Sequence, residues 1–334
     1  MTGTKLKVVT ALLVVACVAL AAQVAAAKSG TKPAAAKAAA APAAASADKV
    51  KIGFVVQLLD PYYTVIVQGA KAAAKANPSV DVLFGAGTSG SDPATEIAKI
   101  QDMLAQGIKI LVVSPQGPGM IPVLNRAVQQ GVKVIFIDTK LAGWNKQTAF
   151  IGTDNAAGSE ALGKYLAKRL GGKGVVGIMP GLLGGCNTCV LRYTNFRRVL
   201  QKAGIKTYLA STADECVEDK AVPIVKTLLV THPDTTALYS ICGPSGIVIT
   251  KVLSDRPAGS KKILSVAWDV LTQEVKDIQA GKMDAAVAQF PVKLGKNAIA
   301  QAVLLSQGKA IPKNTDNGTA IVTKANAAQF LKPR

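Results

Sequence analysis

Short apolar runs alternate with amphipathic segments along most of the chain, beginning near Val50. The runs are rich in Val, Ile and Leu and are continuous, which is typical of strands buried on both faces of a parallel sheet. The first four runs, VKIGFVVQ, VDVLF, KILVVS and VKVIFID, predict strands at 50–57, 80–84, 109–114 and 132–138. The segments between these runs have helical spacing and predict helices at 63–76, 93–107 and 122–131.

The same alternation restarts in the second half of the chain. Further strands are predicted at 174–180, 205–211, 236–242, 261–269 and 283–289, with a short strand at 319–323. Helices are predicted before, between and after them at 159–172, 191–204, 221–233, 245–255, 271–281 and 295–309. Strands that alternate with crossover helices form parallel sheets covered on both faces. The sequence therefore predicts an α/β fold with two doubly wound parallel-sheet lobes.

The first 48 residues differ in composition from the rest. Lys5 and Lys7 precede a long apolar run that ends in three alanines, which predicts a signal peptide over residues 1–27. Residues 28–48 are rich in Ala, Pro and Lys and predict a linker. Two alternatives remain: a lipoprotein anchored through Cys17 in VVAC, or an uncleaved N-terminal anchor, since the apolar run is long enough to span a bilayer. Each of them predicts a periplasmic or otherwise exported protein.

The chain is strongly basic, with a formal net charge of +19 from 39 Lys and Arg against 20 Asp and Glu. Such a charge is a reason to consider nucleic acid or an acidic surface as a partner. The basic residues are nevertheless dispersed, and aromatic residues make up only 4% of the chain, so no basic groove with interleaved aromatic side chains is evident. We therefore expect no nucleic-acid partner.

Enzymatic chemistry finds little support in the sequence. His232 is the only histidine, and it lies in a predicted helix-end turn, where it is a poor candidate for the base of a Ser–His–Asp triad. The GAGTSG stretch at 85–90 resembles a dinucleotide fingerprint in outline, but its third glycine precedes the predicted helix and no acidic residue ends the next strand. We expect no catalytic residues, no cofactor and no resident metal.

Four cysteines lie in the second half of the chain, and three interpretations of them are open. In an exported protein the first is a pair of disulfides among Cys186, Cys189, Cys216 and Cys242, and the sequence does not choose among the three connectivities. The second is a soft-metal site. The third is redox exchange at the Cys-x-x-Cys pair, which precedes a predicted helix. The alternative function is thus a periplasmic metal- or thiol-binding or redox protein that uses this cluster.

Polar residues gather where the predicted strands end, which is the edge where doubly wound folds bind ligands. These strand ends carry Gln57 to Asp60, Ser114-Pro115, Asp138, Cys242-Gly243, Asp269 and Gln289-Phe290-Pro291.

Several of these stretches resemble one family. QLLDPYYTVIVQGAKAAAK is similar to the first strand and helix of type I periplasmic binding proteins, the ribose- and galactose-type sugar-binding subunits of ABC importers. ILVVSP, VIFIDTK, THPDTTALY and SVAWD with AAVAQFP are similar to later segments of that family, so the resemblance covers about residues 50–324. It implies two lobes joined by a hinge, with an N-terminal lobe of residues 49–153 plus 290–317 and a C-terminal lobe of residues 154–289 plus 318–334.

The resemblance also implies a function and a set of ligand-binding residues. The protein would bind a small polar solute, a sugar or a polyol, by hinge closure, act as a monomer and deliver the solute to an ABC importer membrane permease. Carried over residue by residue, the ligand-binding positions are Asp60, Tyr62, Tyr63, Asp138, Arg192, Cys242, Asp269 and Gln289. Family members usually have Asn-Asp where this chain has Cys242-Gly243, and an arginine where it has Thr139. We expect Cys186 and Cys189 to pin the loop before Arg192, through a bond to Cys216 or Cys242.

Overall fold

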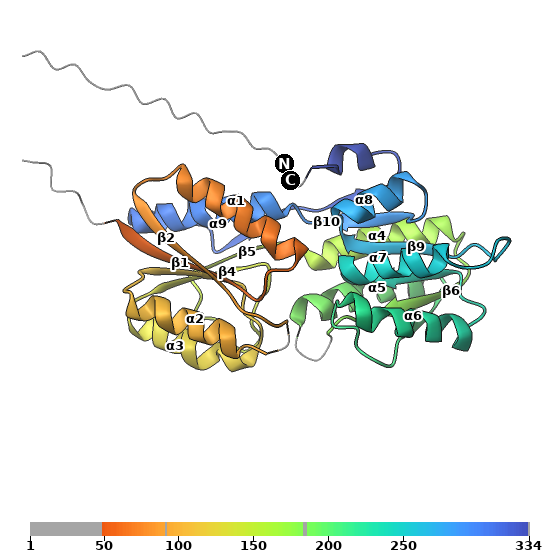
Figure 1. Ribbon diagram of the computed structural model, residues 1–334, viewed down its shortest axis with the longest axis horizontal. Helices are drawn as coiled ribbons and strands as arrows, with labels where there is room; N and C mark the ends of the chain where they lie inside the picture. The colour runs from red at the N-terminus through yellow and green to blue at the C-terminus, as the bar shows by residue number, and fades with distance from the viewer. Residues whose placement is uncertain (1–48, 91, 183–185, 333–334) are drawn as a thin grey trace, which may run out of the picture. The chain divides into compact units, whose positions relative to one another are not determined.

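The computed structural model describes residues 49–90, 92–182 and 186–332, and Figure 1 shows how their helices and strands are arranged. The predicted signal peptide, linker and Cys17 lie outside these residues. Two six-stranded sheets carry the fold, with strand orders β11-β5-β4-β3-β1-β2 and β12-β10-β9-β8-β6-β7. Within the described residues, no helix is both long enough and apolar enough to cross a membrane.

The first sheet is wholly parallel. Its strands are β1 (Val50–Val56), β2 (Val80–Ala86), β3 (Ile110–Val113), β4 (Lys133–Ile137), β5 (Ala149–Gly152) and β11 (Asn314–Asp316). On one face lie α1 (Pro61–Lys75) and α9 (Pro291–Ser306), and on the other lie α2 (Ala94–Ala105), the 3-10 turn η1 (Pro118–Met120) and α3 (Ile121–Gln129). Alternate strand residues pack into the cores on the two faces of this sheet. Phe54 and Val56 pack into the core under α1 and α9, and Val55 packs into the core under α2 and α3.

The second sheet is parallel except at one edge, where β12 pairs antiparallel with β10. Its strands are β6 (Val175–Met179), β7 (Lys206–Leu209), β8 (Ala237–Ser240), β9 (Leu264–Asp269), β10 (Ala285–Ala288) and β12 (Ala320–Val322). One face is covered by α4 (Asn155–Arg169) and α5 (Asn187–Lys202). The other is covered by α6 (Glu218–Thr231), α7 (Gly243–Ser254), α8 (Thr272–Gln279) and the 3-10 turn η2 (Ala327–Phe330). The predicted class of two doubly wound α/β lobes is confirmed.

Three segments of the chain connect the two sheets, after β5, after β10 and after β11. Asn317, in the third connection, is fully buried and ties it to the second, because its amide nitrogen donates to the carbonyl oxygens of Gln289 (2.7 Å) and Phe290 (2.9 Å). Asp316 ties it to the first, since its carboxylate accepts from the backbone N–H of Asp154 at 3.3 Å. The three connections therefore form one hydrogen-bonded group.

Helices α1 and α9 pack closely because glycine faces backbone at two points. A Cβ at Gly69 would collide with the carbonyl group of Val292, and a Cβ at Gly295 would collide with the carbonyl group of Ile66. This contact holds the start of α1, which carries two predicted site residues, next to the start of α9, which follows the second connection.

Candidate ligand-binding site

The first part of the site is built around the carboxylate of Asp138, which follows β4 and is 7% exposed. The Tyr62 hydroxyl donates to its Oδ1 at 3.1 Å, and the Tyr63 hydroxyl donates to its Oδ2 at 2.9 Å. The Thr139 hydroxyl donates to Oδ2 as well, at 3.1 Å. Three hydroxyl donors therefore hold a buried carboxylate, as expected for charge-assisted hydrogen bonds.

The two tyrosines are fixed by their place at the start of α1. Their rings meet edge to face with centroids 5.5 Å apart, and the Tyr63 hydroxyl also lies 3.0 Å from the Ser114 hydroxyl at the end of β3. Burial, and then the nearby Asp138 carboxylate, raise the pKa of both hydroxyls well above the usual value. Both therefore stay protonated and act as donors toward Asp138.

Asp60 is the N-cap of α1, and its Oδ1 accepts from the backbone N–H of Tyr63 at 2.7 Å. This is the ordinary role of an aspartate that precedes a helix. The pKa of Asp60 is raised to about 6, first by burial and then by the carboxylates of Asp269 and Asp138, against the lowering effect of the hydrogen bond. Asp60 therefore lies within electrostatic range of one carboxylate at the strand ends of each sheet, Asp138 after β4 and Asp269 at the end of β9.

The second part of the site is built around Arg192, which is 6% exposed in α5. Its Nε donates to Oδ1 of Asn155 at 2.8 Å, and its Nη1 donates to the carbonyl oxygen of Ile241 at 2.8 Å. Nη1 also lies 3.6 Å from Oδ1 of Asp269, and the guanidinium carbon is 3.9 Å from the centroid of the Trp268 ring. The guanidinium plane is therefore fixed from several sides before any ligand binds.

Asp269 ends β9 in a left-handed backbone conformation, with φ of 93°. Its Oδ2 accepts from the backbone N–H of Gly243 at 2.8 Å, and its Oδ1 accepts from the amide nitrogen of Gln289. Burial raises the pKa of Asp269, although Arg192, Gly243 and Gln289 each favour the charged form. The amide oxygen of Gln289 is buried and has no hydrogen-bond partner within the part of the chain that the structure describes.

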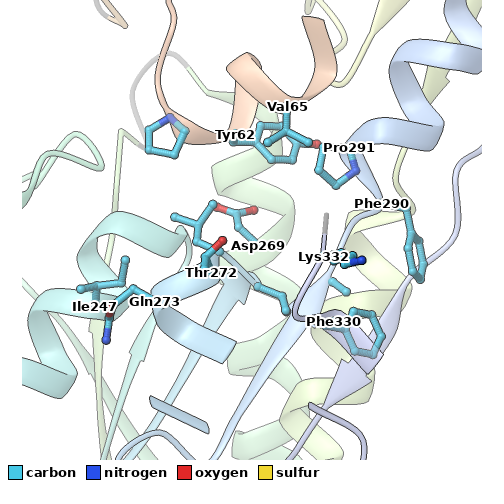
Figure 2. A pocket seen from close by; sticks show the side chains of 14 residues that line it. Tyr62, Val65, Ile247, Asp269, Thr272, Gln273, Phe290, Pro291, Phe330 and Lys332 are labelled. Atoms are coloured by element: carbon cyan, nitrogen blue, oxygen red, sulfur yellow. The ribbon is translucent and has the colours of Figure 1, made fainter. Parts of the chain in front are cut away.

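Two cavities reach this group of residues. The first, about 270 Å³, is bounded by Tyr62 and Val65 of α1, by Asp269 of β9 and by Thr272 of α8, as Figure 2 shows. Phe290 and Phe330 also line it. The second cavity, about 340 Å³, is lined by the following side chains around Asp138: Lys140, Phe150, Thr153, Asp154, Asn155, Asn187, Thr188, Leu191, Asn314, Thr315 and Asp316. Near it, the hydroxyls of Thr139 and Thr188 lie 3.4 Å apart.

Six of the eight predicted ligand-binding residues fall into two clusters. Tyr62, Tyr63 and Asp138 form one hydrogen-bonded cluster, and Arg192, Asp269 and Gln289 form a second, joined by an ion pair and a hydrogen bond. Asp60 is coupled to both by charge. Of the eight residues, Tyr62 and Asp269 line the first cavity and Asp138 lines the second, and the sulfur of Cys242 is bonded to Cys216.

All four cysteines of the second half form disulfides, one between Cys186 and Cys189 and one between Cys216 and Cys242. The expected bond from Cys186 or Cys189 to Cys216 or Cys242 was wrong. Cys186 is the N-cap of α5, which begins at Asn187 and not at 191, and residues three apart in a first helical turn are close enough to bond. With these thiols oxidised, the cluster offers no thiolates, and the metal- or thiol-binding alternative finds no support.

Sequence reasoning missed several residues that position the site. Asn155, Thr188 and Trp268 were not among the candidates, although they hold Arg192 or lie near Asp138. Asn155 follows β5, a four-residue strand that the hydropathy pattern did not reveal. A signal was present, because FIGTDN reads as a strand end followed by an N-cap Asp154, whose Oδ1 accepts from the N–H of Ala157 at 2.9 Å.

Comparisons with known proteins agree with this architecture. A family model described as "Periplasmic binding protein domain" matches residues 52–310. The D-ribose/D-allose-binding protein of Pseudomonas aeruginosa is 27% identical over 280 residues, which cover 81% of this chain and 86% of that protein. The ribose import binding protein of Escherichia coli is 26% identical over 266 residues, 79% of this chain and 87% of that protein.

Solved structures show the same similarity. An ABC transporter solute-binding protein from Mycobacterium smegmatis with bound glycerol has a TM-score of 0.78 and 26% identity, covering 86% of this chain and 98% of that chain. Another, from Burkholderia graminis in complex with D-arabinose, has a TM-score of 0.77 and 26% identity, covering 85% and 98%.

Proposed function

The chain belongs to the periplasmic binding protein family, and we propose that it is an exported protein that binds a small polar solute, a sugar or a polyol, for an ABC importer. The observation that carries this proposal is the convergence of two clusters. Tyr62, Tyr63 and Asp138 belong to the strand ends of the first sheet and to the helix α1 that covers it. Arg192, Asp269 and Gln289 belong to the strand ends of the second sheet and to the helix α5 that covers it.

The chemistry of these groups suits a polyhydroxylated solute. A hydroxyl group both donates and accepts, so carboxylates, an amide and a guanidinium can each make a charge-assisted or paired bond to it. Tyrosine rings offer apolar faces to the C–H groups of a sugar. The names of similar proteins support the same class, since they refer to ribose and allose, and the related structures contain glycerol and D-arabinose.

Solute capture would proceed by hinge closure of two lobes, residues 49–153 plus 290–317 and residues 154–289 plus 318–334. The membership of the two sheets supports these boundaries, because β11 joins the first sheet and β12 the second. The hinge would be the three hydrogen-bonded connections around Asn317. In such proteins closure is favoured when the solute contacts both lobes.

The protein would act by binding alone, as a monomer that presents the solute to a membrane permease. His232, its only histidine, stacks on Tyr208 with ring centroids 3.7 Å apart and lines neither cavity. Export would depend on the signal peptide at 1–27, with the lipid anchor at Cys17 and the uncleaved anchor as alternatives for how the protein is held.

A thermal-shift screen of pentoses, hexoses and polyols tests the proposal, because a solute that binds only the folded state raises the melting temperature. We expect at least one of these compounds to raise it, and Arg192→Ala to remove the shift. A screen in which no sugar, polyol or related amine stabilises a folded protein would contradict the proposed function.

A further inference from the structure

The charges of the candidate site are unbalanced. The carboxyl groups of Asp60, Asp138 and Asp269 influence one another electrostatically. Among the charged groups that shift the pKa values of Asp60, Tyr62 and Asp269, Arg192 is the one cation. Arg192 lies beside Asp269 at 3.6 Å. This acidic excess occurs in a chain whose net charge is +19, so it is not a consequence of the overall composition.

Asp60 and Asp138 lack a cationic partner in residues 49–90, 92–182 and 186–332, where neither has a Lys, Arg or His nitrogen within 4.0 Å. Lys140, two residues after Asp138, places its ammonium 4.5 Å from the centroid of the Phe150 ring. It borders the second cavity together with two further carboxylates, Asp154 and Asp316. Asp138 lines that cavity as well, so one lysine faces three carboxylates there and the excess of negative charge remains.

The hydrogen-bond inventory is unbalanced in the same direction. The hydroxyls of Tyr62 and Tyr63 already donate to Asp138, and the Nε and Nη1 atoms of Arg192 already donate to protein oxygens, which leaves Nη2 as the guanidinium nitrogen that can donate to a ligand. Gln289, 1% exposed, gives its amide nitrogen to Asp269, and its amide oxygen is left without a partner among the described residues. A buried acceptor without a donor is costly, so the site is completed best by a ligand that brings donors.

A bare metal ion fits these acceptors poorly. A metal site needs several ligand atoms around one point, and the three carboxylates do not meet that condition. Across the residues that the structure describes, Asp214, Cys216 and Cys242 are the group of three whose ligand atoms lie within 4.8 Å of one another, and two of these are joined in a disulfide. The separated acceptors suit a larger organic cation.

We propose, on the basis of the proposed function, that the solute is a polyhydroxylated amine, an amino sugar or amino polyol whose ammonium group is bound by Asp60 and Asp138. An ammonium supplies three N–H donors and one positive charge to a site that has an excess of acceptors and negative charge. The faces of Tyr62 and Tyr63 add favourable cation–π attraction wherever the ammonium approaches them.

The protonation of Asp60 supports this assignment. Burial and the two neighbouring carboxylates raise its pKa to about 6, so that near neutral pH it is charged at a free-energy cost. A bound ammonium would offset that cost, which a neutral hydroxyl group would do less well.

Matched pairs of compounds test the proposal by isothermal titration calorimetry at about pH 7, where the amines are largely protonated: D-glucosamine with D-glucose, D-galactosamine with D-galactose, and D-glucamine with D-glucitol. We expect the amine to bind at least about tenfold more tightly than the hydroxyl compound in a pair that binds, which is the ratio expected of one buried hydrogen bond between charged groups. Equal or tighter binding of the neutral members overturns the inference and leaves the proposed function standing. Binding of neither class by folded protein overturns both.

The variant Asp60→Asn removes the negative charge that would bind the ammonium and keeps the helix cap, because asparagine also caps helices well. We expect this variant to lower affinity for the best amine about tenfold more than it lowers affinity for the hydroxyl counterpart, so that the preference for the amine is lost. The matched control is Asp81→Asn, at an exposed position on β2, which removes the same charge outside the site. An unchanged amine preference in Asp60→Asn, or an equal loss in Asp81→Asn, would overturn the role of Asp60.

Discussion

The Nε atom of Arg192 donates a hydrogen bond of 2.8 Å to the side-chain oxygen of Asn155. Asn155 is the first residue of α4, and its own amide nitrogen donates to the carbonyl oxygen of Thr153 at 3.1 Å, in the first connection between the sheets. The orientation of the arginine thus depends on the backbone just after β5, in the segment that we propose as part of the hinge.

This relationship predicts that Asn155 positions Arg192 for the solute. Asn155→Ala removes the acceptor for Nε, and we expect solute affinity to fall about tenfold, because a charge-assisted hydrogen bond to a buried group is worth about 1.5–3 kcal/mol. Asn155→Asp keeps an acceptor and should restore affinity to within about threefold. Calorimetric titration measures both, and wild-type affinity in Asn155→Ala would show that the hydrogen bond does not matter for binding.

Asp138 combines a chemical and a conformational requirement. Its φ is 62°, a left-handed conformation that asparagine and aspartate tolerate better than alanine. We therefore expect Asp138→Asn to stay folded and to lose solute affinity at least about tenfold, because the charged acceptor is gone. Asp138→Ala should also lose affinity and should be less stable than Asp138→Asn, by about 1 kcal/mol for the backbone alone.

Titration and urea unfolding of both Asp138 variants provide the test. Wild-type affinity in Asp138→Asn would contradict the placement of this residue in the site. Equal stability of the two variants would contradict the conformational part of the prediction.

The two disulfides should contribute unequally to stability. Cys216 and Cys242 are 26 residues apart in sequence, whereas Cys186 and Cys189 are three apart. In the chain-entropy model the longer loop stabilises the fold by about 3.5 kcal/mol and the shorter one by less than about 2 kcal/mol. Urea unfolding of the double variants Cys216→Ala/Cys242→Ala and Cys186→Ala/Cys189→Ala measures the difference. A larger loss from the second pair would contradict this ranking.

Asp60 predicts a pH dependence of stability. Its folded-state pKa of about 6 lies above the ordinary value of 3.8, so the folded protein holds this proton more tightly than the unfolded chain. The stability that the protonated Asp60 contributes is fully present below about pH 3.8 and is lost as the pH rises through about 6. Asp60→Asn removes this dependence, and we expect it to raise the melting temperature more at pH 8 than at pH 4. The same change in melting temperature at both values would contradict the raised pKa.

Much of the fold could be predicted because its strands are long, apolar and separated by regular amphipathic helices. The strands that escaped prediction, β5 and β11, pair with each other at the edge of the first sheet. They contain four and three residues, and β11 reads Asn-Thr-Asp, with no apolar residue to indicate a strand. Such strands form because a neighbouring strand offers hydrogen bonds, which the local sequence does not reveal.

The site was predictable in its strand-end residues and less so in what orients them. Asp138 follows β4 directly and Asp269 is the last residue of β9, so their place at the ligand edge follows from the topology. The pairing of Cys216 with Cys242 depends on how the loop after β7 meets the start of α7, which no spacing rule encodes. Asn155 was missed because the strand before it was missed.

A structure of the protein with its tightest-binding solute tests the central claim most directly. The account predicts the solute between the two sheets, against the rings of Tyr62 and Tyr63, with hydrogen bonds to Asp138 and to at least one of Arg192, Asp269 and Gln289. A solute bound elsewhere, or one that contacts residues of a single lobe, would contradict it.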